Sequence, residues 1–163
     1  MPGKPPNRNS QSIARLIQSV ERLLKIRPRS VGELRQRLRG KGFDREIVEA
    51  VLKEFEAKGV LDDRAFASWW ITQRSSFKPT GAFGLLMELK QKRVQEETAK
   101  QAILQSGVTE TEPELAREAL KSRLPRYSRL DPVTSRRRII DFLSRRGFSR
   151  QVIWEIMQNW KGK

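Results

Sequence analysis

The chain contains no cysteine and no histidine among its 163 residues. It therefore offers no thiolate nucleophile, imidazole base, Ser-His-Asp triad or thiolate zinc site, and it can form no disulfide. Its apolar runs are only a few residues long, far short of the ~20 needed to cross a bilayer. The N-terminal stretch MPGKPPNRNSQS lacks the apolar centre of a signal peptide. We therefore expect a cytoplasmic protein with no membrane attachment, metal or cofactor.

Positive charge is abundant and unevenly distributed. Lys and Arg number 34 against 19 Asp and Glu, which gives a net charge of +15. Residues 1–45 carry a net +9 and residues 121–150 a net +8, whereas residues 67–120 are neutral. Dense like charge costs self-repulsion that an anionic partner relieves, so nucleic acid is the expected partner. The alternative interpretation is that these charged faces only meet water.

Helical periodicity dominates, and no segment of useful length alternates like a strand. The first predicted helix has apolar residues at three- and four-residue spacing and ends before Pro28. Ser30 and Glu33 form a capping box for the next helix, and Asp44 and Asp62 are predicted to cap the two that follow.

The helical pattern occurs three times. The apolar positions of residues 34–52 recur at offsets of 51 and 105 residues, and the helix-breaking Gly42 recurs as Gly147. The middle copy has Arg93 at the glycine position and Gln95 at the cap position, so it is the weakest copy. We predict an all-α fold: an elongated array of three tandem three-helix, helix–turn–helix-like modules.

The predicted domain boundaries follow from these repeats. They are a disordered basic tail over 1–12, a first module over 13–60, a second over 61–107, a linker with a short helix over 108–131, and a third module over 132–163 that includes the linker helix. Thr109 and Glu112 are predicted to cap the linker helix, Pro125 to close it, and Asp131 to start the next one.

Helical projection places several arginines on outer faces. Arg35 and Arg39 are predicted to point outward, as are Arg137, Arg138 and Arg145, whereas Arg136 and Arg146 lie nearer the core. The candidate nucleic-acid-binding residues are Arg35, Arg39, Lys41, Arg45, Lys90, Lys92, Arg93, Arg137, Arg138, Arg145 and Arg146.

No catalytic constellation is present. The adjacent acids Asp62 and Asp63 are explained by a helix N-terminus, which favours carboxylates. The glycines Gly81 and Gly84 lack the Gly-Lys-Ser or Gly-Lys-Thr of a phosphate loop. Among the aromatics, Trp69 is a candidate for an interface or for partial burial, and Tyr127 for base stacking or for a packed linker. We do not expect an enzyme.

Two segments resemble the RecX family: LLKIRPRSVGELRQRLRGKGF over 23–43 and GVLDDRAFASWWITQR over 59–74. The positions that carry the resemblance are Leu23, Leu24, Ser30, Glu33, Leu34, Leu38, Lys41, Gly42, Phe43, Leu61, Asp62, Asp63, Phe66 and Ala67. With the three repeats, the similarity extends over roughly residues 20–160.

The resemblance implies a non-enzymatic modulator of the RecA recombinase that acts in recombination, DNA repair and the SOS response. It implies a monomer that binds the RecA–DNA filament and inhibits it, with single-stranded DNA and also double-stranded DNA as candidate partners. The basic residues named above would make those contacts. Alternatives are a RecA-independent DNA- or RNA-binding protein and an interaction scaffold whose charge only promotes solubility.

The middle module departs from the family pattern. Basic residues are usual in its second helix, where this chain has Phe83, Gly84 and Leu86, and Thr72 also replaces a commonly basic residue. The resemblance therefore implies weaker charge contacts by this module, with an apolar surface around Phe83 left for hydrophobic packing or for another partner.

Overall fold

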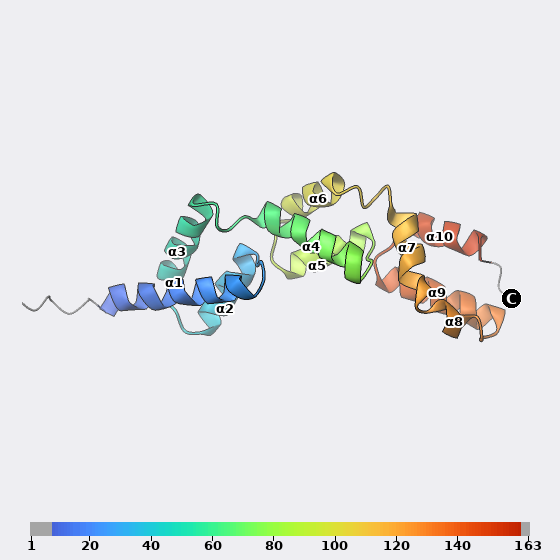
Figure 1. Cartoon of the computed structure of the whole chain (residues 1–163), viewed down its shortest axis with the longest axis horizontal. Helices are drawn as coiled ribbons and strands as arrows, with labels where there is room; N and C mark the ends of the chain where they lie inside the picture. The colour runs from blue at the N-terminus through green and yellow to red at the C-terminus, as the bar shows by residue number, and fades with distance from the viewer. Residues whose placement is uncertain (1–7, 161–163) are drawn as a thin grey trace, which may run out of the picture. The chain divides into compact units, whose positions relative to one another are not determined.

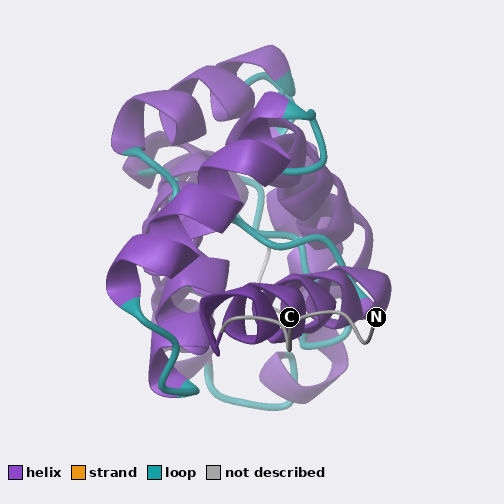
Figure 2. Ribbon diagram, turned by 90° about the vertical axis from the view of Figure 1, so that its left-hand side faces the viewer, coloured by secondary structure: helices purple, strands orange, loops and turns teal. Residues whose placement is uncertain are grey.

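A computed structural model describes residues 8–160, and within that range the chain is helical with no strand (Figures 1 and 2). The helices are α1 (Arg8–Ile26), α2 (Val31–Gly40), α3 (Arg45–Ala57), α4 (Asp63–Phe77), α5 (Ala82–Gln91), α6 (Glu96–Gln105), α7 (Glu112–Lys121), α8 (Leu124–Tyr127), α9 (Pro132–Arg145) and α10 (Arg150–Gln158). The predicted all-α class is confirmed.

The described chain divides into two units. The first contains residues 8–66 together with 92–94, and the second contains residues 67–91 and 95–160. In the first unit, α1, α2 and α3 enclose a single apolar core. Its buried members are Leu16, Val20, Leu23, Val31, Leu34, Leu38, Val48, Val51, Leu52 and Leu61. The repeated apolar positions predicted from the sequence therefore build this core.

Side-chain caps fix the helix starts in the first unit. Ser30 Oγ accepts a hydrogen bond from the Glu33 backbone N–H at 3.0 Å, and Asp44 Oδ1 accepts one from Glu46 at 2.8 Å. Both predicted caps are confirmed. The start of α1 was predicted too late, because the helix begins at Arg8. Of the predicted disordered tail, residues 8–12 are helical, and residues 1–7 lie outside the described part of the chain.

The second unit contains two helical groups. Helix α5 packs on α6, with Leu85, Leu89, Ala99 and Ile103 buried. Helix α10 packs on α7 and α9. The buried residues of this second group are Ala116, Ala119, Leu120, Ile139, Phe142, Leu143, Phe148, Val152, Ile153, Ile156 and Met157.

The segment predicted as a linker is more ordered than expected. It forms α7 and the short α8, and Pro125 lies in the first turn of α8, where its missing N–H costs nothing. The predicted cap at Thr109 is wrong: α7 is preceded by Thr111, whose side chain makes no cap hydrogen bond. Asp131 does cap α9, with its Oδ1 2.9 Å from the Thr134 nitrogen.

One backbone feature recurs at the same repeat position in all three copies. Gly42, Arg93 and Gly147 each end the second helix of a copy in the left-handed region, with φ of 81°, 61° and 71°. The middle copy thus keeps the conformation without the glycine, at a steric cost to its Cβ atom. The presence of arginine instead of glycine at position 93, from which the middle copy was predicted to be the weakest, therefore leaves the left-handed conformation of the turn unchanged.

In each unit, the backbone just before one of these left-handed residues is hydrogen-bonded to the start of an earlier helix. In the second unit, the Gly81 N–H donates to the Arg146 carbonyl at 3.0 Å. In the first unit, Ser30 Oγ is hydrogen-bonded to the carbonyl of Lys92, the equivalent position. A carboxylate also binds the start of each of these helices. Asp63 accepts from the Val31 N–H at the start of α2 at 2.9 Å, and Glu112 accepts from the Ala82 N–H at the start of α5 at 2.9 Å.

Candidate functional site

The predicted outward arginines of α2 are partly occupied within the first unit. Arg35 is half-buried, and its Nε and Nη2 donate to the two carboxylate oxygens of Glu49 on α3 at 2.7 and 3.0 Å. Arg39 Nη2 reaches the same carboxylate at 3.3 Å. Both side chains remain partly exposed, 38% for Arg35 and 42% for Arg39, and both pair with Glu49, so they join α2 to α3 and neither charge is free.

Three exposed cations surround the turn after α2. Lys41 and Arg45 were predicted, and Arg37 was not. Within residues 8–160 none of the three forms an ion pair, in contrast to Arg35. Their charge is therefore available to an anionic partner.

The predicted cations of the middle copy have intramolecular partners. Lys90 donates to Glu96 at 2.7 Å, and the Arg93 Nε donates to Gln36 at 3.0 Å. Together with Lys100, Lys90 lowers the pKa of Glu96 to about 2. Lys92 is half-buried and contacts Glu33 at 3.3 Å. Lys90 and Lys92 therefore carry less free charge than the sequence indicates, whereas the partner of Arg93 is a neutral amide and leaves its charge uncompensated.

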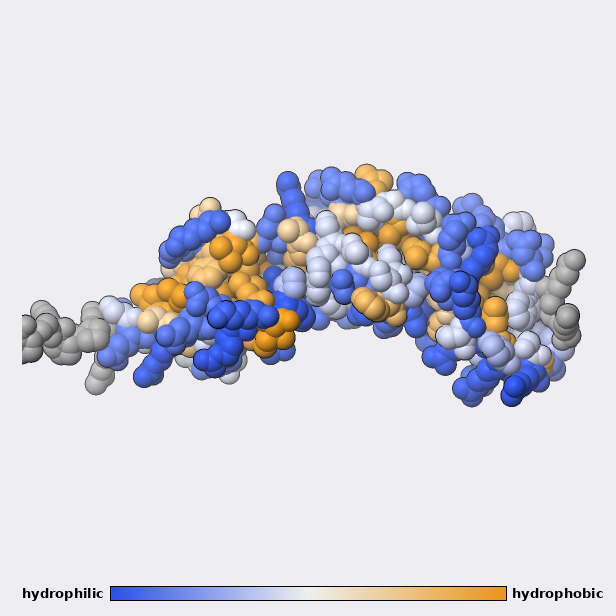
Figure 3. Space-filling view, in the orientation of Figure 1, coloured by the Kyte–Doolittle hydropathy of each residue, from blue (hydrophilic) through white to orange (hydrophobic). Residues whose placement is uncertain are grey.

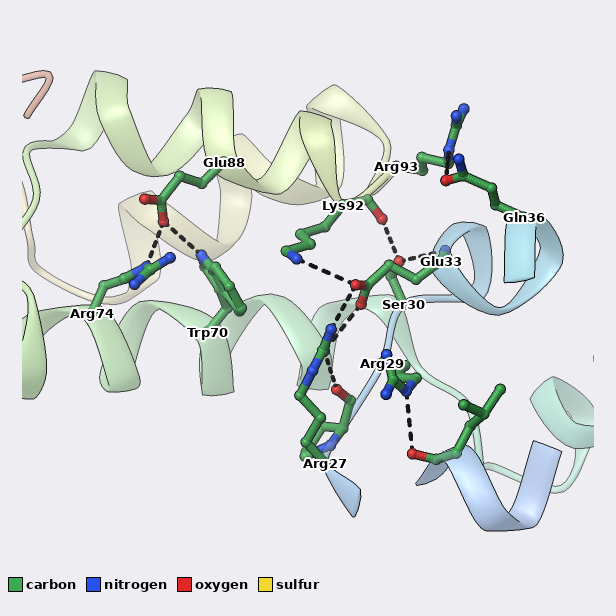
Figure 4. Close-up of polar contacts among 12 residues, drawn as sticks. Arg27, Arg29, Ser30, Glu33, Gln36, Trp70, Arg74, Glu88, Lys92 and Arg93 are labelled. Atoms are coloured by element: carbon green, nitrogen blue, oxygen red, sulfur yellow. Dashed lines mark hydrogen bonds and ion pairs between the residues drawn. The ribbon is translucent and has the colours of Figure 1, made fainter. Parts of the chain in front are cut away.

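Glu33 is the centre of a polar cluster in the first unit (Figure 4). Arg27 donates to both of its carboxylate oxygens, at 2.7 and 3.1 Å, and Lys92 approaches from the other side. Burial opposes ionisation of Glu33, yet these two cations hold its pKa below the usual value. Nearby Arg29 is buried, donates from Nε to the Leu23 carbonyl, and has a lowered pKa because of burial and the charges of Arg27 and Arg37.

This cluster predicts a pH-dependent stability. The lowered pKa of Glu33 means that its ionised form stabilises the fold above its ordinary pKa and that this contribution is lost as the pH falls through the folded-state value. We expect Glu33→Gln to lower the free energy of unfolding by about 2 kcal/mol at pH 7, the typical value of charge-assisted hydrogen bonds. The difference from the parent protein should shrink on acidification below pH 4.5, measured by urea unfolding.

The matched control for that prediction is Glu54→Gln. Glu54 forms an exposed pair with Lys58 in the same unit, so its substitution should change stability by less than about 0.5 kcal/mol. A Glu33→Gln effect that is constant between pH 7 and pH 3 would contradict the assigned role of the carboxylate.

Helix α9 presents the strongest uncompensated charge. Arg137, Arg138 and Arg145 are exposed, as predicted, and within the described residues none forms an ion pair. Arg136 is also exposed, so its predicted position nearer the core is wrong. Figure 3 shows hydrophilic side chains interspersed with hydrophobic ones over the C-terminal helices of the second unit.

Arg146 differs from its exposed neighbours. It is half-buried, its Nη1 donates to the Pro79 carbonyl at 3.0 Å, and its Cζ lies 5.1 Å from the centre of the Phe142 ring. Burial and the charge of Arg123 lower its pKa. Arg146 therefore has a structural role in the α9 turn, whereas Arg123 is an exposed cation that was not among the predicted residues. The signal for Arg123 was the basic and aromatic stretch SRLPRYSRL.

The aromatic candidates are placed as follows. Trp70 donates from Nε1 to Glu88 at 2.9 Å and lies under the Arg74 guanidinium, whose Cζ is 4.5 Å from a Trp70 ring centre (Figure 4). Trp69 is half-buried, and Tyr127 packs partly against the α7–α10 core. Phe83 is 64% exposed.

Other kinds of site find no support in the described chain. Within residues 8–160, no group of Asp and Glu side chains is arranged to hold a metal ion. No helix in that range has the length and apolar character needed to cross a membrane.

Tandem three-helix groups with exposed arginine faces define an all-helical repeat protein with a basic surface. Family models for the first, second and third three-helix domains of RecX match residues 18–55, 62–103 and 110–157. The chain belongs to the RecX family.

Similar proteins agree with this assignment. Regulatory protein RecX of Amycolatopsis mediterranei is 35% identical over 83% of this chain and 77% of its own length, and that of Streptomyces coelicolor is 34% identical over 90% and 76%. A crystal structure of regulatory protein RecX is similar over 98% of this chain and 83% of the crystallised chain, with a TM-score of 0.82 and 20% sequence identity. RecX from Lactobacillus salivarius matches 91% of this chain and 96% of its own with a TM-score of 0.77 at 17% identity. These structures share the fold.

Proposed function

We propose that this protein binds RecA–DNA filaments and inhibits RecA in homologous recombination, DNA repair and the SOS response. It does so in the cytoplasm as a monomer and without catalysis. The observation that carries the proposal is the combination of RecX family membership with exposed, unpaired arginines on α9. A filament offers DNA phosphates and acidic protein surface, both of which attract such a face.

The structure changes which residues we propose for the contact. Arg137, Arg138 and Arg145 in the second unit and Arg37, Lys41 and Arg45 in the first are exposed and form no ion pair within residues 8–160. Arg35, Lys90 and Lys92 already contact carboxylates, so binding through them would first break those pairs. The exposed set therefore supplies most of the proposed attraction.

The test adds the purified protein to RecA on single-stranded DNA and follows ATP hydrolysis and strand exchange. We expect both rates to fall at well under one molecule per RecA subunit, because a bound regulator can block growth of the filament. Unchanged or increased rates with the protein present in sedimented filaments would overturn inhibition. Absence of the protein from the filaments would overturn the proposed partner.

A charge-reversal variant tests the surface. Arg137→Glu, Arg138→Glu and Arg145→Glu together should raise the concentration needed for half-inhibition by about tenfold or more, since each removes a charge-assisted contact. The control reverses three exposed cations elsewhere, Arg15→Glu, Lys53→Glu and Arg64→Glu. Equal loss in both variants, with far-UV circular dichroism unchanged, would show that total charge rather than the α9 face determines inhibition.

A further inference from the structure

A basic hollow lies in the second unit between α4, α8 and α9. Its volume is about 310 Å³, and four of its lining side chains are cationic while none is acidic. The lining residues are Lys78, Arg123, Tyr127, Phe142, Arg145 and Arg146. A concave site with convergent polar groups is the usual form of a small-ligand site, and here the convergent groups are all positive.

Two of the guanidinium groups are held at one aromatic ring. The Arg123 Cζ lies 5.6 Å and the Arg146 Cζ 5.1 Å from the Phe142 ring centre. Arg146 is also fixed by its hydrogen bond to the Pro79 carbonyl. Cation–π contacts thus stabilise two like charges close together, and their remaining N–H donors can bind an anion.

Glu88 is the carboxylate near this cluster, and it faces α4. Its Oε2 accepts from Arg74 at 2.6 Å and from Trp70 at 2.9 Å, while its Oε1 lies 4.0 Å from the Lys78 Nζ. Arg123 and Arg145 form no ion pair within residues 8–160. Glu88 therefore compensates only part of the positive charge.

A second hollow of about 270 Å³ adjoins the first. The two share Lys78, Arg145 and Arg146, and the second adds Phe83, Met87 and the carboxylate of Glu88 from α5. Phe83 is 64% exposed, so its ring is accessible to a ligand. Cations thus lie between the half-buried Tyr127 and the exposed Phe83, and cations beside aromatic rings are typical of surfaces that hold phosphates and stack bases.

We propose that these two hollows together bind one single strand of nucleic acid, with a phosphate held by Arg123 and Arg145 and a base stacked on Phe83. This inference rests on the proposed function, in which the filament carries such a strand. A duplex would fit less well because its bases are already stacked and its base faces are closed. An acidic peptide would use the cations but would leave Phe83 without a role.

The test measures binding of a fluorescent thymidine oligonucleotide of about 12 nucleotides, within the site sizes of single-strand binders. It uses fluorescence anisotropy at one fixed low salt concentration, without RecA. Arg123→Gln with Arg145→Gln should weaken binding about tenfold or more. The control, Arg136→Gln with Arg150→Gln, removes the same charge from exposed positions outside both hollows and should cost less than about threefold. An equal loss of affinity in the two double variants would overturn the proposed site.

A second variant separates stacking from charge and does not depend on a buried residue. Phe83→Ala should weaken the thymidine strand at least about fivefold, the low end for loss of one stacked base. It should leave binding of an abasic deoxyribose-phosphate strand of the same length unchanged. Leu104→Ala, which removes another exposed apolar side chain, should change neither. A Phe83→Ala effect equal on both strands, or no effect, would overturn the stacking assignment.

Competition with poly-glutamate decides between the two classes of partner. Displacement of the oligonucleotide at equal charge concentration, with the same dependence on Arg123 and Arg145, would assign the hollows to an acidic protein segment and overturn the proposal. Because the oligonucleotide assay contains no RecA, failure of the proposed site can be distinguished from failure of the proposed function. Inhibition of RecA without oligonucleotide binding would overturn the site alone, whereas binding without any effect on RecA would overturn the proposed function alone.

Discussion

Replacing Gly147 with alanine is expected to lower the stability of the second unit by about 3 kcal/mol or more. A Cβ added at Gly147 would lie 2.1 Å from the nitrogen and 2.4 Å from the Cα of Gly84. Both atoms are backbone at the start of α5, so the clash is relieved only if α5 moves away. The left-handed φ of 71° adds roughly 1–2 kcal/mol for any residue with a Cβ, and displacement of a packed helix adds typically 1–3 kcal/mol.

Gly42 is the matched control for this substitution. It occupies the equivalent repeat position with a φ of 81°, but a Cβ there would meet no atom within 4 Å. Gly42→Ala should therefore cost only the left-handed conformation, roughly 1–2 kcal/mol. Urea unfolding followed by far-UV circular dichroism measures both. Equal destabilisation by the two variants would show that the approach of Gly147 to Gly84 contributes nothing.

Glu112→Ala should destabilise the second unit by about 2–5 kcal/mol. Only 4% of Glu112 is exposed, and its carboxylate accepts from two backbone donors. The Ala82 N–H at the start of α5 is 2.9 Å from Oε1, and the Ser149 N–H before α10 is 3.4 Å from Oε2. Alanine would remove both part-buried hydrogen bonds to the carboxylate, and a hydrogen bond to a charged group contributes about 1.5–3 kcal/mol.

Two comparison variants define what Glu112 contributes. Glu114→Ala removes the same charge from the first turn of α7, but Glu114 is exposed and only pairs with Arg117, so its effect should stay below about 1 kcal/mol. Glu112→Gln keeps an oxygen for Ala82 and should fall between the two. Thermal unfolding of the three proteins would contradict the assigned role if Glu112→Ala and Glu114→Ala had the same midpoint.

Several features could be predicted from sequence because their causes are local. The caps at Ser30, Asp44 and Asp131 depend on a side chain reaching a backbone N–H two or three residues away. The exposure of Arg137 and Arg138 follows from helical geometry once the apolar face is known. The three repeats follow from spacing alone, and the matches to three RecX domains confirm them.

Other features depended on residues distant in the sequence. The pairing of Arg35 could not be predicted from α2 alone, because its partner Glu49 lies on α3, 2.7 Å away. Asp63 was explained as a helix-start acid, but it also accepts from the Val31 N–H, and burial raises its pKa. Glu112 was predicted as a cap for its own helix, yet it binds the starts of α5 and α10. In each case the partner comes from another helix.

The sequence by itself determined the helical class, the three repeats, the absence of cysteine and histidine chemistry, and a charge of +15 concentrated near two segments. Only the tertiary structure decided which of those charges remain free. Arg35 and Lys92 are bound to carboxylates, whereas Arg123 and Arg145 converge on a hollow. The physical reason is that net charge is a sum over residues and helical periodicity is a local pattern, so both can be read from the sequence. An ion pair requires two side chains within about 4 Å of each other, and that distance is set by how the helices pack.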